Sequence, residues 1–466
     1  MNDNLVEQLA GLVGSAHVLT DPQALAGALV EPRGLYVGRA RALVRPASTA
    51  EVAAVVRACA AAKTPITPQG GNTGLVGGQI PEGPEILLSL TRLNRVREVD
   101  ALADSLIVEA GVTLAEAQSA AERADRLFPL SLASEGSCTI GGNLSTNAGG
   151  VAVLAYGNAR ELTTGIEVVL ADGRVVNALS KLRKDNTGYD LKDLFIGAEG
   201  TLGIITAAAL KLFAKPKARE TVFVGLQSPA RALALFRSAR ETFGAAIVSF
   251  ELIPRIAVEF VLRHAARARD PLEQPHPWYV LVELATQTAG GLAEAATEWL
   301  AGAAEAGLID DAALAASGEQ RDAFWRLREE ISDVQRLEGG SIKHDVSVPI
   351  GAVPDFIAEA SAAVARRTPG ARVVAFGHMG DGNVHFNVSQ PIGADKAAFL
   401  ADWDGMNEIV HAVVETYQGS FSAEHGVGRM KRALLNAKKD PGALDVMRRL
   451  KAALDPDGIM NPGKVL

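Results

Sequence analysis

Cysteine is almost absent from this chain, and so are segments that would insert it in a membrane. Cys59 and Cys138 are the only cysteines in 466 residues. We therefore expect no disulfide framework, and we expect the protein to lie in a reducing compartment. No apolar run approaches the ~20 residues that cross a bilayer, and the acidic N-terminus lacks the basic start of a signal peptide. We expect a cytoplasmic protein without a membrane span.

Basic residues are also in deficit. The chain has 46 lysines and arginines against 54 acidic residues, which gives a formal net charge of −8. Phosphate-binding surfaces need a cationic excess, so nucleic acid is not expected as a partner. The 48% hydrophobic content and the 46 glycines are typical of a soluble α/β enzyme. A chain of this length exceeds the size of one hydrophobic core, so at least two domains are expected.

The first half of the chain follows an α/β pattern. Residues 42–80 alternate as strand, helix and strand, with Ser48 and Glu51 spaced as a capping box at the start of the helix. Short strands and a helix that Thr113 can cap follow. A proline and a cluster of charges within residues 211–219 mark a domain boundary.

The second half predicts a different arrangement. Strands alternate with alanine-rich helices from about residue 220 to about 415, which is typical of an α+β domain with its own sheet. The last stretch reads as two helices and a tail rich in proline and glycine, a segment that would dock on another part of the chain. We therefore expect three parts, covering residues 1–217, 218–420 and 421–466.

Glycine is concentrated in three loops of the first half, at residues 68–78, 135–150 and 197–205. Such loops present backbone N–H groups without Cβ atoms, which is the geometry that a pyrophosphate needs. Taken alone, the first loop is equally well an ordinary turn, but three such loops favour a large anionic ligand. Neither a G-x-G-x-x-G opening a helix nor a P-loop pattern is present, which disfavours NAD and ATP.

Two histidines flank a tight turn in the second half. Residues 376–388 read as strand, Gly-Asp-Gly turn and strand, which brings His378 and His385 together across a hairpin. A lone histidine is more often structural, but a pair around a turn favours a metal site. Glu424, beside His425 in a glycine-containing loop, offers a third ligand. Two histidines and one carboxylate suit zinc, manganese or iron alike.

The loop that carries Glu424 and His425 also has a structural interpretation. Glu424 would pair with Arg429 or Lys431 at a helix start, and His425 would cap that helix. The sequence alone leaves both interpretations open.

A helix predicted over residues 321–337 carries an arginine without an ionic partner on the same helix. Arg328 has only aromatic and aliphatic residues and Ser332 at three- and four-residue spacings, whereas Arg326 has acidic residues on both sides. A guanidinium at the edge of an apolar face either clamps a substrate carboxylate or is solvated.

The three glycine-rich loops, in this order and with these residues, resemble the flavin domain of the vanillyl-alcohol oxidase family, in the branch of the D-lactate and D-2-hydroxyglutarate dehydrogenases. The likeness covers nearly the whole chain. It implies an α+β fold, with a two-part FAD-binding domain of the vanillyl-alcohol oxidase type and an α+β substrate domain that has an antiparallel sheet. Residues 421–466 would dock back on the FAD domain. The first loop has neither histidine nor cysteine, so non-covalent FAD is expected.

The resemblance implies a role for each loop. Residues 70–74 would hold the pyrophosphate, residues 135–150 would surround the ribityl chain and the isoalloxazine, and residues 199–205 would reach the adenine. The residues expected to bind FAD are Pro68, Gly70, Gly71, Asn72, Thr73, Gly74, Leu75, Gly136, Ser137, Gly141, Gly142, Asn143, Thr146, Asn147, Gly149, Gly150, Glu199, Gly200, Gly203, Ile204, Ile205 and Asn461.

The same resemblance favours zinc as the divalent metal on His378, His385 and Glu424. The metal would bind the carboxylate and the 2-hydroxyl of the substrate and lower the pKa of the hydroxyl. His425 would then take the hydroxyl proton as general base while the hydride passes to the flavin.

Four further residues are expected to bind the substrate. Arg328 would hold one carboxylate, and Ser332 stands where the branch has a threonine. Lys343, which alone would form an ordinary ion pair with Asp345, and Asn387 would bind a distal carboxylate, which favours a dicarboxylic acid.

The implied function is a metal-assisted FAD-dependent dehydrogenase that oxidises a D-2-hydroxy acid to the 2-oxo acid. D-2-hydroxyglutarate or D-malate is favoured over D-lactate or glycolate. An electron-transfer flavoprotein or a quinone would reoxidise the flavin. A homodimer is one assembly that the sequence allows. Three alternatives remain: a metal-independent flavin oxidase, a colourless metal-dependent hydrolase, and a flavin-binding subunit without catalysis.

Overall fold

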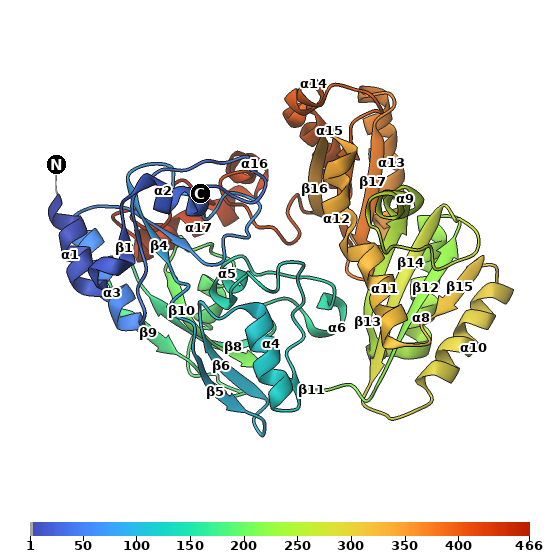
Figure 1. The fold of residues 1–466 in the computed structure, drawn as a ribbon, viewed down its shortest axis with the longest axis horizontal. Helices are drawn as coiled ribbons and strands as arrows, with labels where there is room; N and C mark the ends of the chain where they lie inside the picture. The colour runs from blue at the N-terminus through green and yellow to red at the C-terminus, as the bar shows by residue number, and fades with distance from the viewer. Residues whose placement is uncertain (1–2) are drawn as a thin grey trace. The chain divides into compact units, whose positions relative to one another are not determined.

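The computed structural model describes residues 3–466; Met1 and Asn2, which begin the acidic N-terminus, lie outside the described residues. The chain divides into two compact units. The first holds the chain up to Gly150, together with Gly157–Lys215 and Glu424–Leu466, and the second holds Val151–Tyr156 and Pro216–Ala423. Both ends of the chain, blue and red in Figure 1, therefore belong to the first unit.

A small mixed sheet forms one layer of the first unit, with strand order β1-β2-β4-β3. Its strands are β1 (Val18–Leu19), β2 (Ala40–Val44), β3 (Ile66–Gln69) and β4 (Glu85–Ser89), and its helices are α1 (Asp3–Val13), α2 (Pro22–Leu25) and α3 (Thr49–Ala61). β2 and β3 run parallel to β4, and α3 connects β2 to β3. The Ser48 Oγ accepts the N–H of Glu51 at 3.2 Å, so the predicted N-cap of α3 is confirmed.

A second, antiparallel sheet lies in the same unit, with strand order β5-β6-β10-β8-β9. Its strands are β5 (Val96–Asp100), β6 (Ser105–Glu109), β8 (Thr163–Val169), β9 (Val175–Ala178) and β10 (Ile204–Lys211), and β7 (Arg126–Leu127) pairs with β11 (Phe213–Ala214). The helices of this part are α4 (Leu114–Arg123), α5 (Ile140–Ser145) and α7 (Lys192–Phe195). The side chain of Thr113 accepts from the N–H of Glu116, which confirms the predicted cap of α4.

The C-terminal segment of the first unit contains α16 (Arg432–Lys438) and α17 (Pro441–Leu454). Asp455 follows α17 and is 3% exposed. Its carboxylate accepts from Lys451 Nζ at 2.5 Å and from the N–H groups of Ile459 and Met460 at 3.0 and 2.9 Å. These bonds fold the tail so that Met460 forms a parallel bridge with Ile66 of β3.

The second unit is built on a seven-stranded antiparallel sheet with strand order β15-β12-β14-β13-β17-β18-β16. Its strands are β12 (Ala218–Leu226), β13 (Ile247–Pro254), β14 (Trp278–Thr286), β15 (Asp311–Leu314), β16 (Ser341–Ser347), β17 (Arg372–His378) and β18 (Asn383–Ser389). Its helices are α6 (Val153–Tyr156), α8 (Pro229–Phe243), α9 (Arg255–His264), α10 (Leu292–Glu305), α11 (Gly318–Glu329), α12 (Ile331–Val334), α13 (Val353–Arg367), α14 (Lys396–Ala401) and α15 (Trp403–Thr416).

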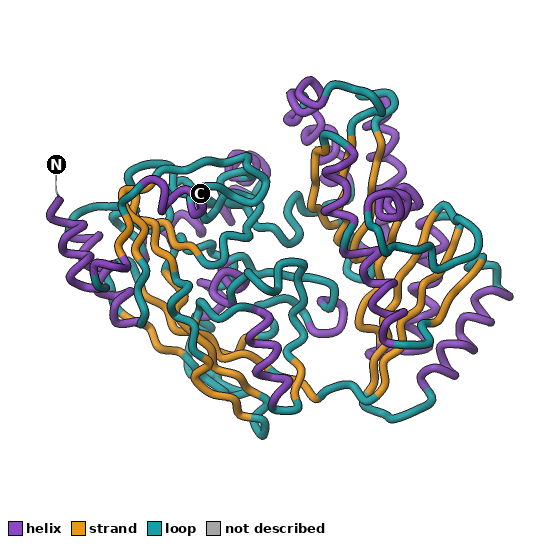
Figure 2. The backbone as a smooth tube through the Cα atoms, viewed as in Figure 1, coloured by secondary structure: helices purple, strands orange, loops and turns teal. Residues whose placement is uncertain are grey.

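Helices cover this sheet on both faces, as Figure 2 shows by colour. Because side chains alternate along a strand, Val222 and Val224 of β12 enter one core while Phe223 between them enters the other. α8, α10, α13 and α15 contribute to the first core, and α9, α11 and α12 contribute to the second. The sheet is therefore apolar on both faces, and any charged residue within it needs a specific partner.

The predicted helix over residues 321–337 is divided in the structure. α11 ends at Glu329, α12 resumes at Ile331, and a 3-10 turn, η4, covers Gln335–Glu338. Glu330 at the junction keeps helical dihedral angles, with φ −74° and ψ −11°, so the axis continues while the hydrogen bonding changes.

Replacement of Asp455 tests how the tail is held. Asp455→Ala should lower the free energy of unfolding of the first unit by roughly 2–3 kcal/mol, because it leaves two buried backbone N–H groups without their acceptor and removes the carboxylate partner of Lys451. Urea unfolding measures this change. Asp457→Ala, an exposed position in the same turn, is the matched control and should leave stability unchanged; equal stability of both variants would contradict the interpretation.

Candidate active site

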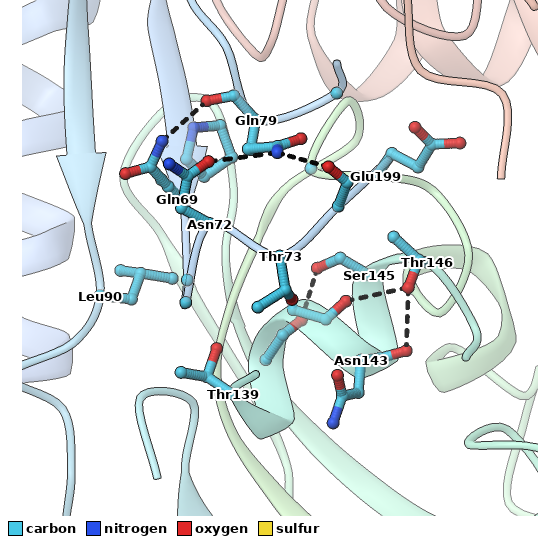
Figure 3. A pocket seen from close by; sticks show the side chains of 18 of the residues that line it. Gln69, Asn72, Thr73, Gln79, Leu90, Thr139, Asn143, Ser145, Thr146 and Glu199 are labelled. Atoms are coloured by element: carbon cyan, nitrogen blue, oxygen red, sulfur yellow. Dashed lines mark hydrogen bonds between the residues drawn. The ribbon is translucent and has the colours of Figure 1, made fainter. Parts of the chain in front are cut away.

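The glycine-rich loops of the first unit enclose one pocket (Figure 3). The loop after β3 supplies one wall, the start of α5 supplies another, and Glu199 with Gly200 supplies a third. The pocket is lined by Pro68, Gln69, Gly70, Gly71, Asn72, Thr73, Gly74, Val76, Gly78, Gln79, Leu90, Thr139, Gly141, Gly142, Asn143, Ser145, Thr146, Glu199 and Gly200.

Two loops approach each other so closely that only glycine fits. A Cβ on Gly71 would lie 1.8 Å from the carbonyl oxygen of Ser137, and a Cβ on Gly70 would lie 2.2 Å from the Oγ1 of Thr139. The Thr139 Oγ1 is buried and has no hydrogen-bond partner among the described residues, although it lines the pocket. A ligand with polar oxygens would satisfy it, so the pocket fits a phosphate-bearing cofactor.

Gln79 fixes the shape of the first loop. Its Nε2 donates to the Asn72 Oδ1 at 3.2 Å and to the Gly74 carbonyl at 2.8 Å, as the dashed lines in Figure 3 show. Asn72 has a φ of 55°, a left-handed conformation that asparagine tolerates better than most residues. The Asn72 Nδ2 also donates to the carbonyl of Val30 at 2.9 Å. The loop is therefore preformed by side-chain bonds as well as by glycine.

The predicted flavin-binding residues divide into two groups. Pro68 of β3 and the predicted residues of the following loop up to Gly74, with Gly141, Gly142, Asn143, Thr146, Glu199 and Gly200, line the pocket. The others do not line it: Leu75, Gly136, Ser137, Asn147, Gly149, Gly150, Gly203, Ile204, Ile205 and Asn461. Some of this second group support the walls. The Asn461 Nδ2, for example, donates to the carbonyls of Gly78 and Glu199 at 2.9 and 2.7 Å.

Glu199 connects the pocket to the loop that carries the predicted base. Its carboxylate accepts the N–H groups of Val427 and Gly428 at 2.7 and 2.8 Å, two and three residues after His425. Glu199 is 7% exposed. Burial raises the pKa of Glu199 to about 7, against the lowering effect of those two N–H groups and of Lys431. Glu424 is held in the same unit, where its Oε1 accepts the N–H of Gly150 at 2.9 Å.

In the second unit, His378 and His385 meet at the turn between β17 and β18, as predicted. Their ring centroids are 5.4 Å apart. Each histidine has a carboxylate at its Nδ1: Glu251 Oε1 lies 2.7 Å from that of His378, and Asp345 Oδ1 lies 3.8 Å from that of His385. Both carboxylates come from neighbouring strands in register, because Glu251 pairs with His378 and Asp345 pairs with His385.

Arg328 is neither solvated nor unpaired. It is 7% exposed, its Nε donates to Glu251 Oε2 at 2.7 Å, and its guanidinium lies 4.8 Å from the ring centroid of Phe376. Burial alone would raise the pKa of Glu251, but His378 and Arg328 outweigh it and lower that pKa to about 2. Glu251 is therefore a carboxylate shared by two predicted site residues.

The residues expected to bind a distal carboxylate lie side by side on β16 and β18. Lys343 and Asn387 are direct cross-strand partners. The Lys343 Nζ donates to the carbonyl of Ser332 at 3.3 Å, whereas the residue Ser332 itself is exposed. The Asn387 Nδ2 donates to Gln335 Oε1 at 2.8 Å, and Asn387 is 3% exposed.

His378, His385 and Glu424 stay the candidate ligands for a metal ion. The two histidines lie in the second unit, and Glu424 is the first residue of the C-terminal segment of the first unit. The backbone just before Glu424 is held by Ala423, whose N–H donates to the carbonyl of Asp345 at 3.3 Å. Of the two alternative partners of Glu424, Arg429 and Lys431, Arg429 lies 3.7 Å from Glu82. A set of two nitrogens and one oxygen suits zinc, manganese or iron.

Sequence reasoning missed Glu251, Thr139 and Gln79. Glu251 had a usable signal, because it is the one charged residue in the apolar run of residues 247–254, and charge in a buried strand demands a partner. Thr139 lies within a loop that the sequence singled out, but nothing in the sequence distinguished it from its polar neighbours. Gln79 carried no signal at all.

Comparison with known proteins now decides the family. Residues 215–465 match the C-terminal domain of FAD linked oxidases, and residues 40–179 match an FAD binding domain. The chain belongs to the FAD-linked oxidases. It is an FAD-binding oxidoreductase, as the three loops predicted.

Relatives of this FAD-linked oxidase cover nearly its whole length. The D-2-hydroxyglutarate dehydrogenase of Bos taurus is 40% identical over 99% of this chain and 83% of the relative, and that of Rattus norvegicus is 38% identical over 96% and 82%. The enzyme of the same name from Xanthomonas citri pathovar viticola is 38% identical over 91% of this chain and 89% of the relative.

Solved structures share the fold at low sequence identity. p-Cresol methylhydroxylase with bound substrate is 17% identical with a TM-score of 0.78, and it matches 99% of this chain and 96% of its own. The 4-ethylphenol oxidase of Gulosibacter chungangensis is 18% identical with a TM-score of 0.75, over 99% and 96%. The predicted α+β fold, with an FAD-binding part of the vanillyl-alcohol oxidase type and an antiparallel sheet in the other part, is confirmed.

The predicted cytoplasmic location is wrong by these comparisons. The rat, cattle, Danio rerio and Arabidopsis thaliana relatives are all named mitochondrial proteins. The prediction failed because a scarcity of cysteine indicates a reducing compartment and does not say which one. Among the described residues, none of the helices combines the length and apolar character needed to cross a membrane.

A pair of glycine variants tests the closeness of the loops. Gly71→Ala should purify with little or no flavin, because the added Cβ would displace the Ser137 carbonyl and open the pocket wall. Gly136→Ala is the control, since a Cβ there meets no atom within 4 Å although Gly136 precedes Ser137 in the facing loop. The ratio of flavin to protein absorbance measures both. Full flavin content in Gly71→Ala would contradict the prediction.

Glu199→Gln should remove a pH-dependent loss of stability. Because the pKa of Glu199 is raised to about 7 in the folded chain, the folded state keeps a proton that the unfolded chain has released. Wild-type stability relative to Glu199→Gln should therefore be highest near pH 5 and should decrease toward about pH 8. Thermal unfolding of both proteins across this range measures the difference, and a constant difference would rule the effect out.

Proposed function

We propose that this FAD-linked oxidase is a metal-assisted dehydrogenase of D-2-hydroxy dicarboxylic acids, with D-2-hydroxyglutarate as first choice and D-malate as second. The observation that carries the proposal is the pair of His378 and His385, whose ring centroids are 5.4 Å apart and each of which has a carboxylate at its Nδ1. Glu424 would add the third ligand of the metal. A 2-hydroxy acid offers a metal two oxygens, one from its carboxylate and one from its hydroxyl. The relatives named D-2-hydroxyglutarate dehydrogenase support this substrate.

The cofactors would supply the chemistry that side chains lack. Non-covalent FAD would accept the hydride from C2, and zinc on the three ligands would act as a Lewis acid toward the hydroxyl. The residues that line the pocket include neither cysteine nor histidine, which supports a non-covalent flavin. His425, which follows the ligand Glu424, is the proposed general base for the hydroxyl proton.

The substrate would be held by a cation at each end. Glu251 occupies the Nε edge of Arg328, and the remaining guanidinium N–H groups are proposed to bind the first carboxylate in a bidentate manner. Lys343 and Asn387, as cross-strand partners, are proposed to bind the distal carboxylate. Ser332 would contribute near this second position, since its carbonyl accepts from Lys343. A quinone or an electron-transfer flavoprotein is proposed as the final electron acceptor.

Anaerobic reduction of the bound flavin tests the proposal. D-2-hydroxyglutarate should bleach the flavin fastest, D-malate more slowly, D-lactate and glycolate poorly, and the L-acids not at all. Removal of metal with a chelator should slow bleaching by roughly 100-fold or more, because Lewis-acid assistance is worth several kcal/mol. Bleaching by L-acids would overturn the substrate assignment, and bleaching unchanged by chelation would overturn the metal. Preference for D-lactate would favour the monocarboxylate alternative.

The same assay with Lys343→Ala isolates the distal carboxylate. The KM for D-2-hydroxyglutarate should rise roughly 10–100-fold, as for the loss of a charge-assisted hydrogen bond, while the KM for D-lactate should stay the same. Lys396→Ala, an exposed lysine of α14, is the matched control and should change neither. An equal rise for both substrates would show that Lys343 does not recognise a second carboxylate.

A further inference from the structure

Glu251 and Asp345 are almost fully buried carboxylates beside the proposed metal ligands, and each side chain is 1% exposed. Glu251 lies in β13, a strand whose eight residues are all buried. Burial of a carboxylate in an apolar sheet is costly unless each oxygen finds a strong donor. A carboxylate in this position therefore has to be explained by the groups it binds.

Both oxygens of Glu251 are committed, and to different groups. Oε1 bonds to Nδ1 of His378 at 2.7 Å, and Oε2 accepts from Nε of Arg328 at 2.7 Å. Because an ionised carboxylate only accepts, the proton between Glu251 and His378 lies on the histidine Nδ1. The remaining ring nitrogen, Nε2, is then the one that can offer a lone pair to a metal.

We propose that Glu251 is a positioning residue that aligns the metal site and the substrate clamp together. It fixes the tautomer of His378 so that Nε2 faces the metal, and it holds the Nε edge of Arg328 so that the other N–H groups are presented to the substrate carboxylate. The inference rests on the proposed function for the identity of the metal site. One side chain would thus set the spacing between the Lewis acid and the cation that grips the same substrate.

The chemistry of the glutamine substitution makes the proposal specific. Glutamine has nearly the shape of glutamate but offers one acceptor oxygen and one donor NH₂. If its NH₂ faces His378, the histidine proton moves to Nε2 and the metal loses a ligand. If its NH₂ faces Arg328, two donors oppose each other and the guanidinium moves. Either orientation damages one of the two functions.

The experiment measures Zn²⁺ binding to the full-length, flavin-loaded protein after removal of metal, by competition with a chromophoric chelator. Glu251→Gln should bind Zn²⁺ roughly 10–100-fold more weakly than the wild type, the usual cost of losing such a partner of a metal-bound histidine. Glu283→Gln is the matched control: Glu283 is a buried carboxylate on the adjacent strand β14, but it accepts from Trp325 Nε1 at 2.8 Å. Its Zn²⁺ affinity should equal that of the wild type.

Two further readouts separate positioning from general damage. The ¹⁵N chemical shifts of labelled histidine, assigned with a His378→Gln variant, should report Nδ1–H at His378 in the metal-free wild type and an altered tautomer in Glu251→Gln. Steady-state kinetics of metal-saturated Glu251→Gln should show a raised KM, because a displaced Arg328 binds the substrate carboxylate less well, and also a lower kcat. Glu251→Asp, which keeps both acceptors on a shorter stem, should recover part of the Zn²⁺ affinity.

The outcomes distinguish this inference from the proposed function. A wild type that binds no Zn²⁺ would overturn the metal part of the proposed function, and the histidine spectrum would still decide the role of Glu251. A wild type that binds Zn²⁺ while a folded Glu251→Gln binds it equally, with the same His378 tautomer and an unchanged KM, would overturn the inference alone. If Glu251→Gln does not fold, the Glu251→Asp variant decides by the same criteria.

Discussion

A carboxylate removed from water must recover as many strong hydrogen bonds as it loses, and this constraint organises both units of the chain. In the second unit, Glu251 recovers them from His378 and Arg328. In the first unit, Glu199 recovers only part of them from the backbone N–H groups that follow His425, because its pKa stays raised to about 7. Each acid binds groups on or near a residue proposed for catalysis or binding. A displaced donor would leave the buried acid with fewer hydrogen bonds, so each acid favours one position of its donors.

The pocket follows a second constraint, the closeness of two loops. Gly70 and Gly71 are required because the facing loop leaves no room for a Cβ, whereas Gly136 in that facing loop has open space around it. Glycine content alone therefore does not identify a phosphate cradle. What matters is which glycine faces a backbone carbonyl, and that depends on how β3 and α5 approach each other. The buried hydroxyl of Thr139 also lines the pocket, and a polar group of a ligand would give it a hydrogen-bond partner.

Local features were predictable from the sequence, and distant pairings were not. The caps at Ser48 and Thr113 and the meeting of His378 with His385 depend on spacings of a few residues, and the structure shows all of them. The partner of Arg328 is 77 residues away on another strand, so helix spacing could show only that no partner was nearby. The family resemblance supplied the flavin, but the sequence alone could not show that Leu75 and Ile204 do not line the pocket. Likewise, nothing in the sequence predicted that residues 151–156 belong with the second unit.

The proposed selection of a dicarboxylate has a physical basis in the amide of Asn387. This side chain is 3% exposed and gives one Nδ2 hydrogen to Gln335, whose own Nε2 donates to Ser389 at 2.9 Å. That chain fixes the orientation of the amide, because a flipped Asn387 would turn its oxygen toward the acceptor oxygen of Gln335. The second Nδ2 hydrogen is the one left for an anion, beside the ammonium group of its cross-strand partner Lys343. An anionic substrate end suits this pair of donors, whereas a methyl group would leave the buried amide hydrogen unsatisfied and would be disfavoured.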